Sequence, residues 1–297
     1  MSSKVLNTGL NFSGNRFYLS VANSLMQDKV AITLASGEVD FDINRDWFLT
    51  GGDQFTKPIT TEIQKYLVNH TSPILSVTLD PALYLYTRIP INHRNLTQDE
   101  LERLVNEETE RITGDKHNLF IFEWLPLKNN HILVFWIPAV VVSQLQILAS
   151  RLGKKLHIVD FEPLAIMNLM NDRQFIPGED SIHLVIGNKE SGFNLLGFDE
   201  KEVVLYDHFI GHPAEDIPFY VHKCLNDMQI KPRSIARIFW YGKFTTPILS
   251  GIRSVTGHQP KNLFENLKIL YHRHADTSAF TLENALPGIA VSYRTDA

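Results

Sequence analysis

The same order of predicted elements occurs twice in this chain, in two copies about 170 residues apart. Each copy has three short strands of alternating pattern, then a helix with apolar residues at helical spacing, then a buried strand. The first copy covers strands 7–13, 16–22 and 29–35, helix 60–68 and strand 73–79, and the second covers strands 182–186, 193–198 and 203–209, helix 217–228 and strand 235–240. We therefore expect two lobes of similar architecture, and 297 residues are enough for two hydrophobic cores.

A segment with its own pattern separates the two copies. Thr97 is followed three residues later by Glu100, which is the capping-box pattern at the start of a helix. Apolar runs at 119–124 and 132–137 predict a hairpin, and Pro138 lies where a second helix begins. We interpret this segment as an α/β insertion. The expected domains are a first lobe at 1–93, an inserted subdomain at 94–155 and a second lobe at 156–297.

Charge and cysteine content argue against several classes of protein. A net charge of -5 and a pI near 6.2 disfavour a general nucleic-acid role, because binding to phosphates needs clustered Lys and Arg. The single cysteine, Cys224, cannot form an internal disulfide. The first residues lack the apolar core of a signal peptide, and no stretch approaches the ~20 apolar residues of a membrane span. We expect a cytoplasmic protein, with peripheral attachment to the inner membrane through a partner left open.

Three stretches resemble the PilM family of type IV pilus assembly proteins, which belongs to the actin-like ATPase superfamily. They are GLNFSGNRFYLSVA near the start, SVTLDPALYLYTRIPINHRNLTQDELERLVNEETERI in the middle and KLHIVDFEPLAIMNLM before the second lobe. The C-terminal LENALPGIAVSYR is similar to the closing helix of that family. The resemblance implies an α/β fold of the actin-like type, which is a duplicated ribonuclease H-like architecture with two lobes and an α/β insertion in the first lobe.

The resemblance also implies a kind of partner. In that family, an actin-like cytoplasmic protein binds nucleotide and holds the short cytoplasmic tail of an inner-membrane assembly protein. Secretion-system homologues of the same plan do without nucleotide. Which of the two this chain follows depends on its phosphate loops.

The first phosphate hairpin of the superfamily carries an acid and a glycine, so that a carboxylate organises magnesium while backbone N–H groups approach the phosphates. The resemblance places Asn11 and Ser13 at these two positions. Asn11 has no negative charge to help hold magnesium, and Ser13 restricts the backbone, although Gly14 and Asn15 still permit a tight turn. We expect a degraded phosphate loop.

The second hairpin, LVIGNKESG, has Val185 at the place of the acid and keeps Gly187. The loop IFWYGKFT resembles the adenosine loop but keeps only Gly242 of a glycine pair. Loss of the carboxylates at Asn11 and Val185 predicts no hydrolysis, because a lost catalytic group costs orders of magnitude in rate. The predicted cofactor-binding residues of these loops are Asn11, Ser13, Gly14, Asn15, Gly187, Asn188, Ser191 and Gly242.

Two further sets of residues have competing interpretations. Asp160 and Glu162, two residues apart, lie at the end of a predicted strand. Their carboxylates can bind a metal or a basic partner, but helix capping is the favoured interpretation. We also expect an extended peptide of the partner to bind in a groove between the first lobe and the insertion. The candidate anchors, at least half of which are expected to be core, are Phe120, Phe122, Trp124 and Trp136.

These features favour a catalytically silent, actin-like scaffold of a type IV pilus or type II secretion-like assembly. Under this hypothesis we expect no cofactor, no metal and no nucleic acid. The alternative is a nucleotide-binding actin-like ATPase, or a related phosphotransferase, that binds ATP and Mg²⁺ through the altered loops.

Overall fold

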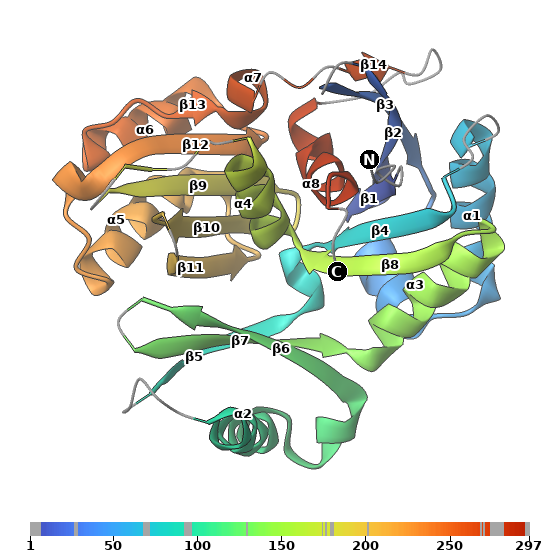
Figure 1. Cartoon of the computed structure of the whole chain (residues 1–297), viewed down its shortest axis with the longest axis horizontal. Helices are drawn as coiled ribbons and strands as arrows, with labels where there is room; N and C mark the ends of the chain where they lie inside the picture. The colour runs from blue at the N-terminus through green and yellow to red at the C-terminus, as the bar shows by residue number, and fades with distance from the viewer. Residues whose placement is uncertain are drawn as a thin grey trace.

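The computed structural model consists of two twisted β-sheets with helices packed against and between them (Figure 1). It describes residues 7–26, 29–67, 72–91, 97–128, 130–173, 175, 177–178, 181–200, 202–267, 269, 271–273 and 282–294. Most of the predicted strands and helices lie within these ranges.

The first sheet has the strand order β14-β3-β2-β1-β4-β8. Its strands are β1 (Asn7–Ser13), β2 (Arg16–Met26), β3 (Lys29–Glu38), β4 (Ile74–Leu79), β8 (Lys155–Phe161) and β14 (Tyr271–Arg273). The first three form the predicted antiparallel meander, and β4 and β8 continue the sheet in parallel orientation. The turn between β1 and β2 is tight because Gly14 has a φ of 58°, which glycine adopts without strain.

The second sheet repeats this arrangement. Its strands β9 (Ile182–Lys189), β10 (Gly192–Phe198) and β11 (Val203–Ile210) form a second antiparallel meander. β12 (Ile235–Gly242) is parallel to β9, and β13 (Lys261–Asn262) is parallel to β12. The order β11-β10-β9-β12-β13 therefore matches the order β3-β2-β1-β4-β8, which confirms the predicted repeat.

The insertion extends the second sheet. Its strands β5 (Leu85–Pro90), β6 (Phe120–Leu127) and β7 (His131–Pro138) pair antiparallel in the order β6-β7-β5. β6 joins β11 through one residue pair, Leu127 with Val203. Helix α2 (Gln98–Thr113) packs on these strands and begins where predicted, because Thr97 and Glu100 form a capping box. The insertion therefore has a small core of its own.

Helices fill the space around and between the sheets. Besides short 3₁₀ segments, the other helical segments are η1 (Ile43–Phe48, a π-helix), α1 (Asp53–Leu67), α3 (Ala139–Arg151), α4 (Glu162–Asp172), α5 (Ile217–Asp227), α6 (Thr246–Thr256), α7 (Leu263–Leu267) and α8 (Leu282–Ser292). Between the sheets lie α4 and α8, where α8 contacts β1, β2 and β4 (Figure 1). The largest core cluster accordingly contains residues of both sheets, such as Leu10 and Leu196.

The sheets do not follow the predicted limits of 1–93, 94–155 and 156–297. β5 lies within the first range but pairs along its length with β7 of the insertion. β8, apart from its first residue, lies within the last range but is hydrogen-bonded to β4 of the first sheet. Helix α8 also lies in the last range and packs on β1 and β2. The first lobe is thus assembled from segments that are far apart in the sequence.

Candidate functional site

Asn11 lies near the end of β1 and is covered by α8. Its side chain is fully buried, its Nδ2 donates to the carbonyl oxygen of Asn284 at 3.0 Å, and its Oδ1 accepts the backbone N–H of Gly288 at 3.1 Å. The helix can approach this closely because Gly9 has no Cβ atom. A Cβ at this position would overlap the carbonyl oxygen of Gly288. Asn11 thus uses both ends of its amide to hold α8 on the first hairpin.

The register of the two hairpins shows which residue of the second corresponds to Asn11. The last residue pairs before the two turns are Ser13 with Arg16 and Lys189 with Gly192. Two residues before each of these pairs lie Asn11 in the first hairpin and Gly187 in the second. Val185, predicted at the place of the acid, lies two residues further back and is fully buried in the core. Neither Asn11 nor Gly187 carries a carboxylate.

An aromatic ring closes the space beside Gly187. A Cβ atom on Gly187 would overlap the ring of Tyr241, which is fully buried and donates its hydroxyl to Asn194 Oδ1 at 3.1 Å. The next residue, Asn188, donates its Nδ2 to a backbone carbonyl of the loop after β12. Gly242, with a φ of 88°, has no room for a Cβ beside the carbonyl oxygen of Asn188. The structure therefore brings these three predicted residues together.

The tips of the two hairpins face each other across the boundary between the sheets. A Cβ atom on Gly14, at the first tip, would overlap the carboxylate of Glu190, at the second. Asn15 hydrogen-bonds within its own lobe, where its Nδ2 donates to the carbonyl oxygen of the residue after β3 at 3.1 Å. By contrast, Ser191 Oγ crosses to the other lobe and donates to Asp80 Oδ1 at 2.7 Å. Gly14 and Ser191 thus belong to one cluster at this boundary, together with Glu190 and Asp80, whereas Asn15 bonds within the first lobe.

Glu162 and Lys189 form an ion pair in the interior beside this cluster. Glu162 is the first residue of α4, Lys189 is the last residue of β9, and their side chains are 0% and 2% exposed. Burial raises the pKa of the Glu162 carboxyl, and the Lys189 ammonium opposes that shift. The prediction that Glu162 caps α4 is wrong, because its carboxylate binds Lys189 and α4 has no side-chain cap among the described residues.

Asp160, at the end of β8, forms a second buried ion pair. It is 6% exposed, its Oδ1 accepts the backbone N–H of Phe161 at 2.8 Å, and its Oδ2 pairs with Arg294, which follows α8. Burial raises the pKa of Asp160, and the guanidinium of Arg294 opposes that shift. The capping prediction is wrong here too, because the carboxylate is committed to Arg294 and to the residue next to it.

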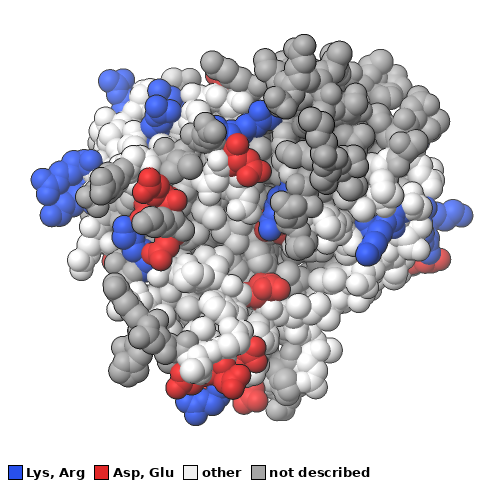
Figure 2. Space-filling view, in the orientation of Figure 1, with Lys and Arg blue, Asp and Glu red and all other residues white. Residues whose placement is uncertain are grey.

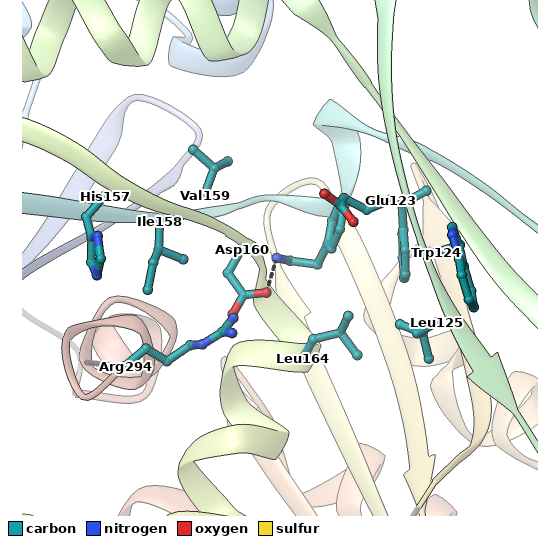
Figure 3. Close-up of a pocket in the computed structure, with 11 residues that line it drawn as sticks. Glu123, Trp124, Leu125, His157, Ile158, Val159, Asp160, Leu164 and Arg294 are labelled. Atoms are coloured by element: carbon teal, nitrogen blue, oxygen red, sulfur yellow. Dashed lines mark hydrogen bonds and ion pairs between the residues drawn. The ribbon is translucent and has the colours of Figure 1, made fainter. Parts of the chain in front are cut away.

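A groove lies between the first sheet and the insertion, and Asp160 and Arg294 line it (Figure 3). The cavity within it has a volume of about 400 Å³. One wall is β8 from His157 to Phe161, and the other includes Glu123, Trp124 and Leu125 of β6. We call this the β6–β8 groove. A second cavity of about 650 Å³, which shares His157 and Val159, continues along β8 toward the C-terminal end of α3.

Both walls of the β6–β8 groove are strand edges. β8 ends its sheet: it is paired with β4 on one side and, among the described residues, with no strand on the other. β6 meets β11 only through Leu127, so the described part of the chain provides no second strand for residues 120–126. Strand edges offer backbone N–H and C=O groups for pairing with another segment.

The four aromatic residues predicted as anchors divide between the core and the groove. Trp136 is fully buried, and its Nε1 donates to Thr109 Oγ1 of α2 at 2.7 Å. Phe120, Phe122 and Trp124 are partly buried against the same core of the insertion. Of the four, Trp124 also lines the β6–β8 groove. Most of this set therefore serves the packing of α2, as expected for at least half.

The charged side chains of the described residues show no concentration of one sign at the groove. Acidic side chains gather over α2 (Figure 2), where Glu107 and Glu108 pair with Arg103 and Arg111. The Lys and Arg side chains visible on the same face lie apart from one another. Within the described ranges, no group of three or more His, Cys, Asp and Glu side chains could hold a metal ion, and no helix is long and apolar enough to cross a membrane.

Comparison with solved structures shows which fold this is. The chain matches a chain of the "PilM-PilN type IV pilus biogenesis complex" with a TM-score of 0.73 and 12% identity over 97% of each chain. It matches the cytoplasmic domain of EpsL, an inner membrane component of the type II secretion system of Vibrio cholerae, with a TM-score of 0.53 and 12% identity, over 96% of this chain and 93% of that chain.

A third similar structure is a protein of unknown function from Bacteroides thetaiotaomicron with an actin-like ATPase fold. The TM-score is 0.54 and the identity 13%, over 87% of this chain and 91% of that chain. No protein-family model and no curated protein matches the sequence. At these identities the structural likeness establishes the fold, which is the predicted two-lobed actin-like fold with an α/β insertion.

Proposed function

We propose that this chain is a catalytically silent scaffold of a type IV pilus or type II secretion-like assembly, and that it binds the cytoplasmic tail of an inner-membrane protein. Two structures that share its fold come from such systems, one a PilM-PilN complex and the other the cytoplasmic domain of an inner membrane component. In this proposal the chain works in the cytoplasm and is held at the inner membrane by its partner.

The β6–β8 groove is the observation that carries the proposal. An extended segment placed along β8 can pair with the backbone groups at its outer edge, in the manner of strand addition. Apolar side chains of that segment can then enter the cavity beside Leu125, Phe135 and Leu164. The groove thus offers both of the binding contributions that an extended peptide uses, main-chain hydrogen bonds and side-chain pockets.

The Asp160–Arg294 pair gives the groove a polar contact. Arg294 remains 32% exposed although Asp160 is 7% exposed, both measured on the side chain. A guanidinium has five N–H donors. Among the described residues, Arg294 pairs with no carboxylate other than Asp160, so several of these donors can bind backbone carbonyl oxygens of a bound tail. Arg294 therefore favours an extended tail whose carbonyl groups are not used within a helix.

Catalytic silence is supported by the two hairpins. Their corresponding residues, Asn11 and Gly187, have no carboxylate with which to position a metal ion. The amide of Asn11 is bound to α8, and the ring of Tyr241 fills the space beside Gly187. Nucleotide binding by an ATPase or phosphotransferase stays the alternative prediction, and no specific contact among the described residues favours it.

Site-specific cross-linking in intact cells tests the scaffold proposal. A photoreactive residue in place of Val159, in the β8 wall, is expected to cross-link an inner-membrane protein through its cytoplasmic tail, as mapped by mass spectrometry. Leu125→Asp places a charge in the opposite wall and should lower the cross-linking yield ~tenfold, a change of about 1.4 kcal/mol. Ile121→Asp is the matched control, because Ile121 lies on the same face of β6 but does not line the groove.

Two outcomes of this experiment contradict the proposal. One is a cross-link to soluble proteins alone. The other is an equal loss of yield in Leu125→Asp and Ile121→Asp, which shows that the groove is not the contact.

Thermal unfolding with Mg-ATP and with Mg-ADP tests the alternative. A ligand at about 100 times its Kd stabilises the folded state by ~2.7 kcal/mol. We expect no increase in Tm for the wild-type protein. An increase that disappears in Ser191→Ala would instead establish nucleotide binding at the hairpin tips and replace the silent scaffold by the alternative.

A further inference from the structure

The Lys189–Glu162 pair joins the two lobes in the interior of the molecule. Lys189 belongs to the second hairpin, whereas Glu162 begins α4, which packs on strands of both sheets. Their side chains are 2% and 0% exposed, the lowest exposure of any ion pair among the described residues. Neither charge is solvated by bulk water, so each depends on the other for stabilisation.

The surroundings of this pair contain more negative than positive charge. Asp80, which follows β4, is 1% exposed and accepts the Ser191 hydroxyl with Oδ1. The charge of Asp80 adds to burial in raising the pKa of Glu162. Asp80 Oδ2 has no hydrogen-bond partner among the described residues, whereas a hydrogen bond from Tyr241 opposes the rise in the pKa of Glu162. Two buried carboxylates therefore lie in this region, and Glu162 is the one that pairs with the Lys189 ammonium.

The groups around the ammonium have the chemistry of a cation site. The ammonium contacts the Glu162 carboxylate and the carbonyl oxygen of Phe12, which lies 3.5 Å from Lys189 Nζ. The Asp80 carboxylate, whose charge acts on Glu162, holds the Ser191 hydroxyl and adds two further kinds of oxygen to the region. Carboxylate, hydroxyl and carbonyl oxygens are the ligands of hard divalent cations. These residues also lie at the carboxyl ends of strands, where open α/β sheets bind ligands.

We propose that Lys189 is a built-in cation, whose ammonium fills an oxygen-lined site between the lobes that takes a divalent cation once the lysine side chain is removed. The ammonium then joins the two lobes without an external ligand. Mg²⁺ commonly binds through one or two carboxylates and keeps several of its waters, so two carboxylates with neighbouring oxygens are sufficient for it. This inference goes beyond the proposed scaffold function, which concerns the β6–β8 groove.

The response of Tm to MgCl₂ tests the inference on the intact chain. Lys189→Ala empties the site and leaves both carboxylates, and it should lower Tm by about 8 °C, because breaking a buried pair leaves an uncompensated charge. MgCl₂ should restore at least half of that loss. Wild type should not respond to MgCl₂, because its site is filled.

Two matched variants separate the cation site from packing. Lys189→Met removes the charge but fills the same space, so Tm should fall by a similar amount without recovery in MgCl₂. In Lys189→Ala with Glu162→Gln the space is empty but one carboxylate is gone, so the Mg²⁺ response should be lost. The neutral pair Lys189→Met with Glu162→Gln should recover most of the lost Tm, and it provides a folded comparison if Lys189→Ala folds only in MgCl₂.

Three outcomes overturn the inference. One is a wild-type Tm that rises in MgCl₂ as much as that of Lys189→Ala. The second is a Lys189→Ala protein that folds without MgCl₂ and does not respond to it. The third is an equal Mg²⁺ response with and without Glu162→Gln. Cross-linking through Val159 is measured separately, so failure of the groove proposal and failure of this one are distinguishable.

Discussion

The two hairpins β1–β2 and β9–β10 have the same register at their turns, but they are held in place in different ways. The first is fixed within its own lobe, where Asn11 binds α8 and Asn15 binds the residue after β3. The second reaches across to the other lobe, where Lys189 pairs with Glu162 and Ser191 binds Asp80. One hairpin therefore stabilises a lobe, and the other connects the lobes.

The comparison shows that the residue type at equivalent positions of the two hairpins depends on the element that packs on each hairpin. At the equivalent places, the first hairpin has Asn11 under a helix backbone that offers an N–H and a carbonyl oxygen, whereas the second has Gly187 under the ring of Tyr241. A hydrogen-bonding amide suits the first surface, and the absence of a Cβ suits the second. The repeat is thus conserved in backbone and register while its side chains differ.

Gly9→Ala should break the first hairpin most severely. The new Cβ would overlap the carbonyl oxygen of Gly288, so β1 and α8 must separate and their contacts would be lost. We expect a loss of about 3 kcal/mol or more in the free energy of unfolding, measured by denaturant titration. Gly178→Ala is the control, because its nearest neighbour is 3.7 Å away and it should be neutral. A loss below ~1 kcal/mol in Gly9→Ala would show that α8 is not held tightly on β1.

Asn11→Asp restores a carboxylate to the first hairpin and should destabilise the protein by about 2 kcal/mol. The aspartate keeps an acceptor for the N–H of Gly288 but loses the donor to the carbonyl oxygen of Asn284, and it buries an unpaired charge. Denaturant titration measures the stability, and phosphate release from ATP is assayed in parallel. We expect no phosphate release from either protein, and release by the variant alone would contradict the role assigned to α8.

Tyr241→Phe tests the corresponding surface of the second hairpin. It removes the hydroxyl that donates to Asn194 Oδ1 at 3.1 Å and leaves that buried acceptor with one partner fewer. We expect a loss of about 1 kcal/mol in the free energy of unfolding, which is smaller than for Asn11→Asp because no charge is buried. Tyr220→Phe, whose hydroxyl contacts the exposed His212, serves as the control and should change stability by less than ~0.5 kcal/mol.

His183→Phe should have the smallest effect near neutral pH, within ~0.5 kcal/mol. His183 corresponds in register to Asn7 of the first hairpin, but it lies among Phe198 and Phe239 and its Nδ1 has no hydrogen-bond partner among the described residues. Burial, with a contribution from Arg237, lowers the pKa of His183 from 6.5 to about 4. The folded protein therefore binds this proton less readily than the unfolded chain.

The sign of the pH dependence follows from that lowered pKa. The contribution of neutral His183 is present above about pH 6.5 and is lost as the pH falls toward 4. Unfolding of wild type and His183→Phe, measured over this range, should show a smaller loss of stability in the variant. Equal losses would assign the acid sensitivity to other groups, among them His208, which both proteins contain and whose pKa is also lowered to about 4.

The local elements are predictable from sequence because their signals lie within a few residues. Alternation and a turn glycine define the hairpin around Gly14, and the capping box of Thr97 and Glu100 defines the start of α2. The strands of the second meander follow from the same alternation. Such signals act over short distances, so they state which elements form but not which elements pair.

The assembly of the first lobe and the interior ion pair are not predictable in this way. The placement of β8 and α8 in the first lobe depends on contacts between distant residues, such as Asn7 with Val291. Lys189 and Glu190 are adjacent residues near one turn, yet the first is buried against Glu162 and the second lies at the tip. Charged residues beside a turn are usually solvated, so nothing local marks Lys189 as an interior residue. Contact of the predicted loop residues with a cofactor stays a prediction.

The position of α8 has a consequence for folding of the chain during translation. Asn11 and Gly288 are 277 residues apart, so β1 leaves the ribosome long before the helix that covers it. The second lobe has its meander, α5 and α6 between Ile182 and Thr256, and it can close earlier. Nascent chains expose apolar surface while such distant partners are missing. The first sheet should therefore be the surface that chaperones shield until α8 has been made.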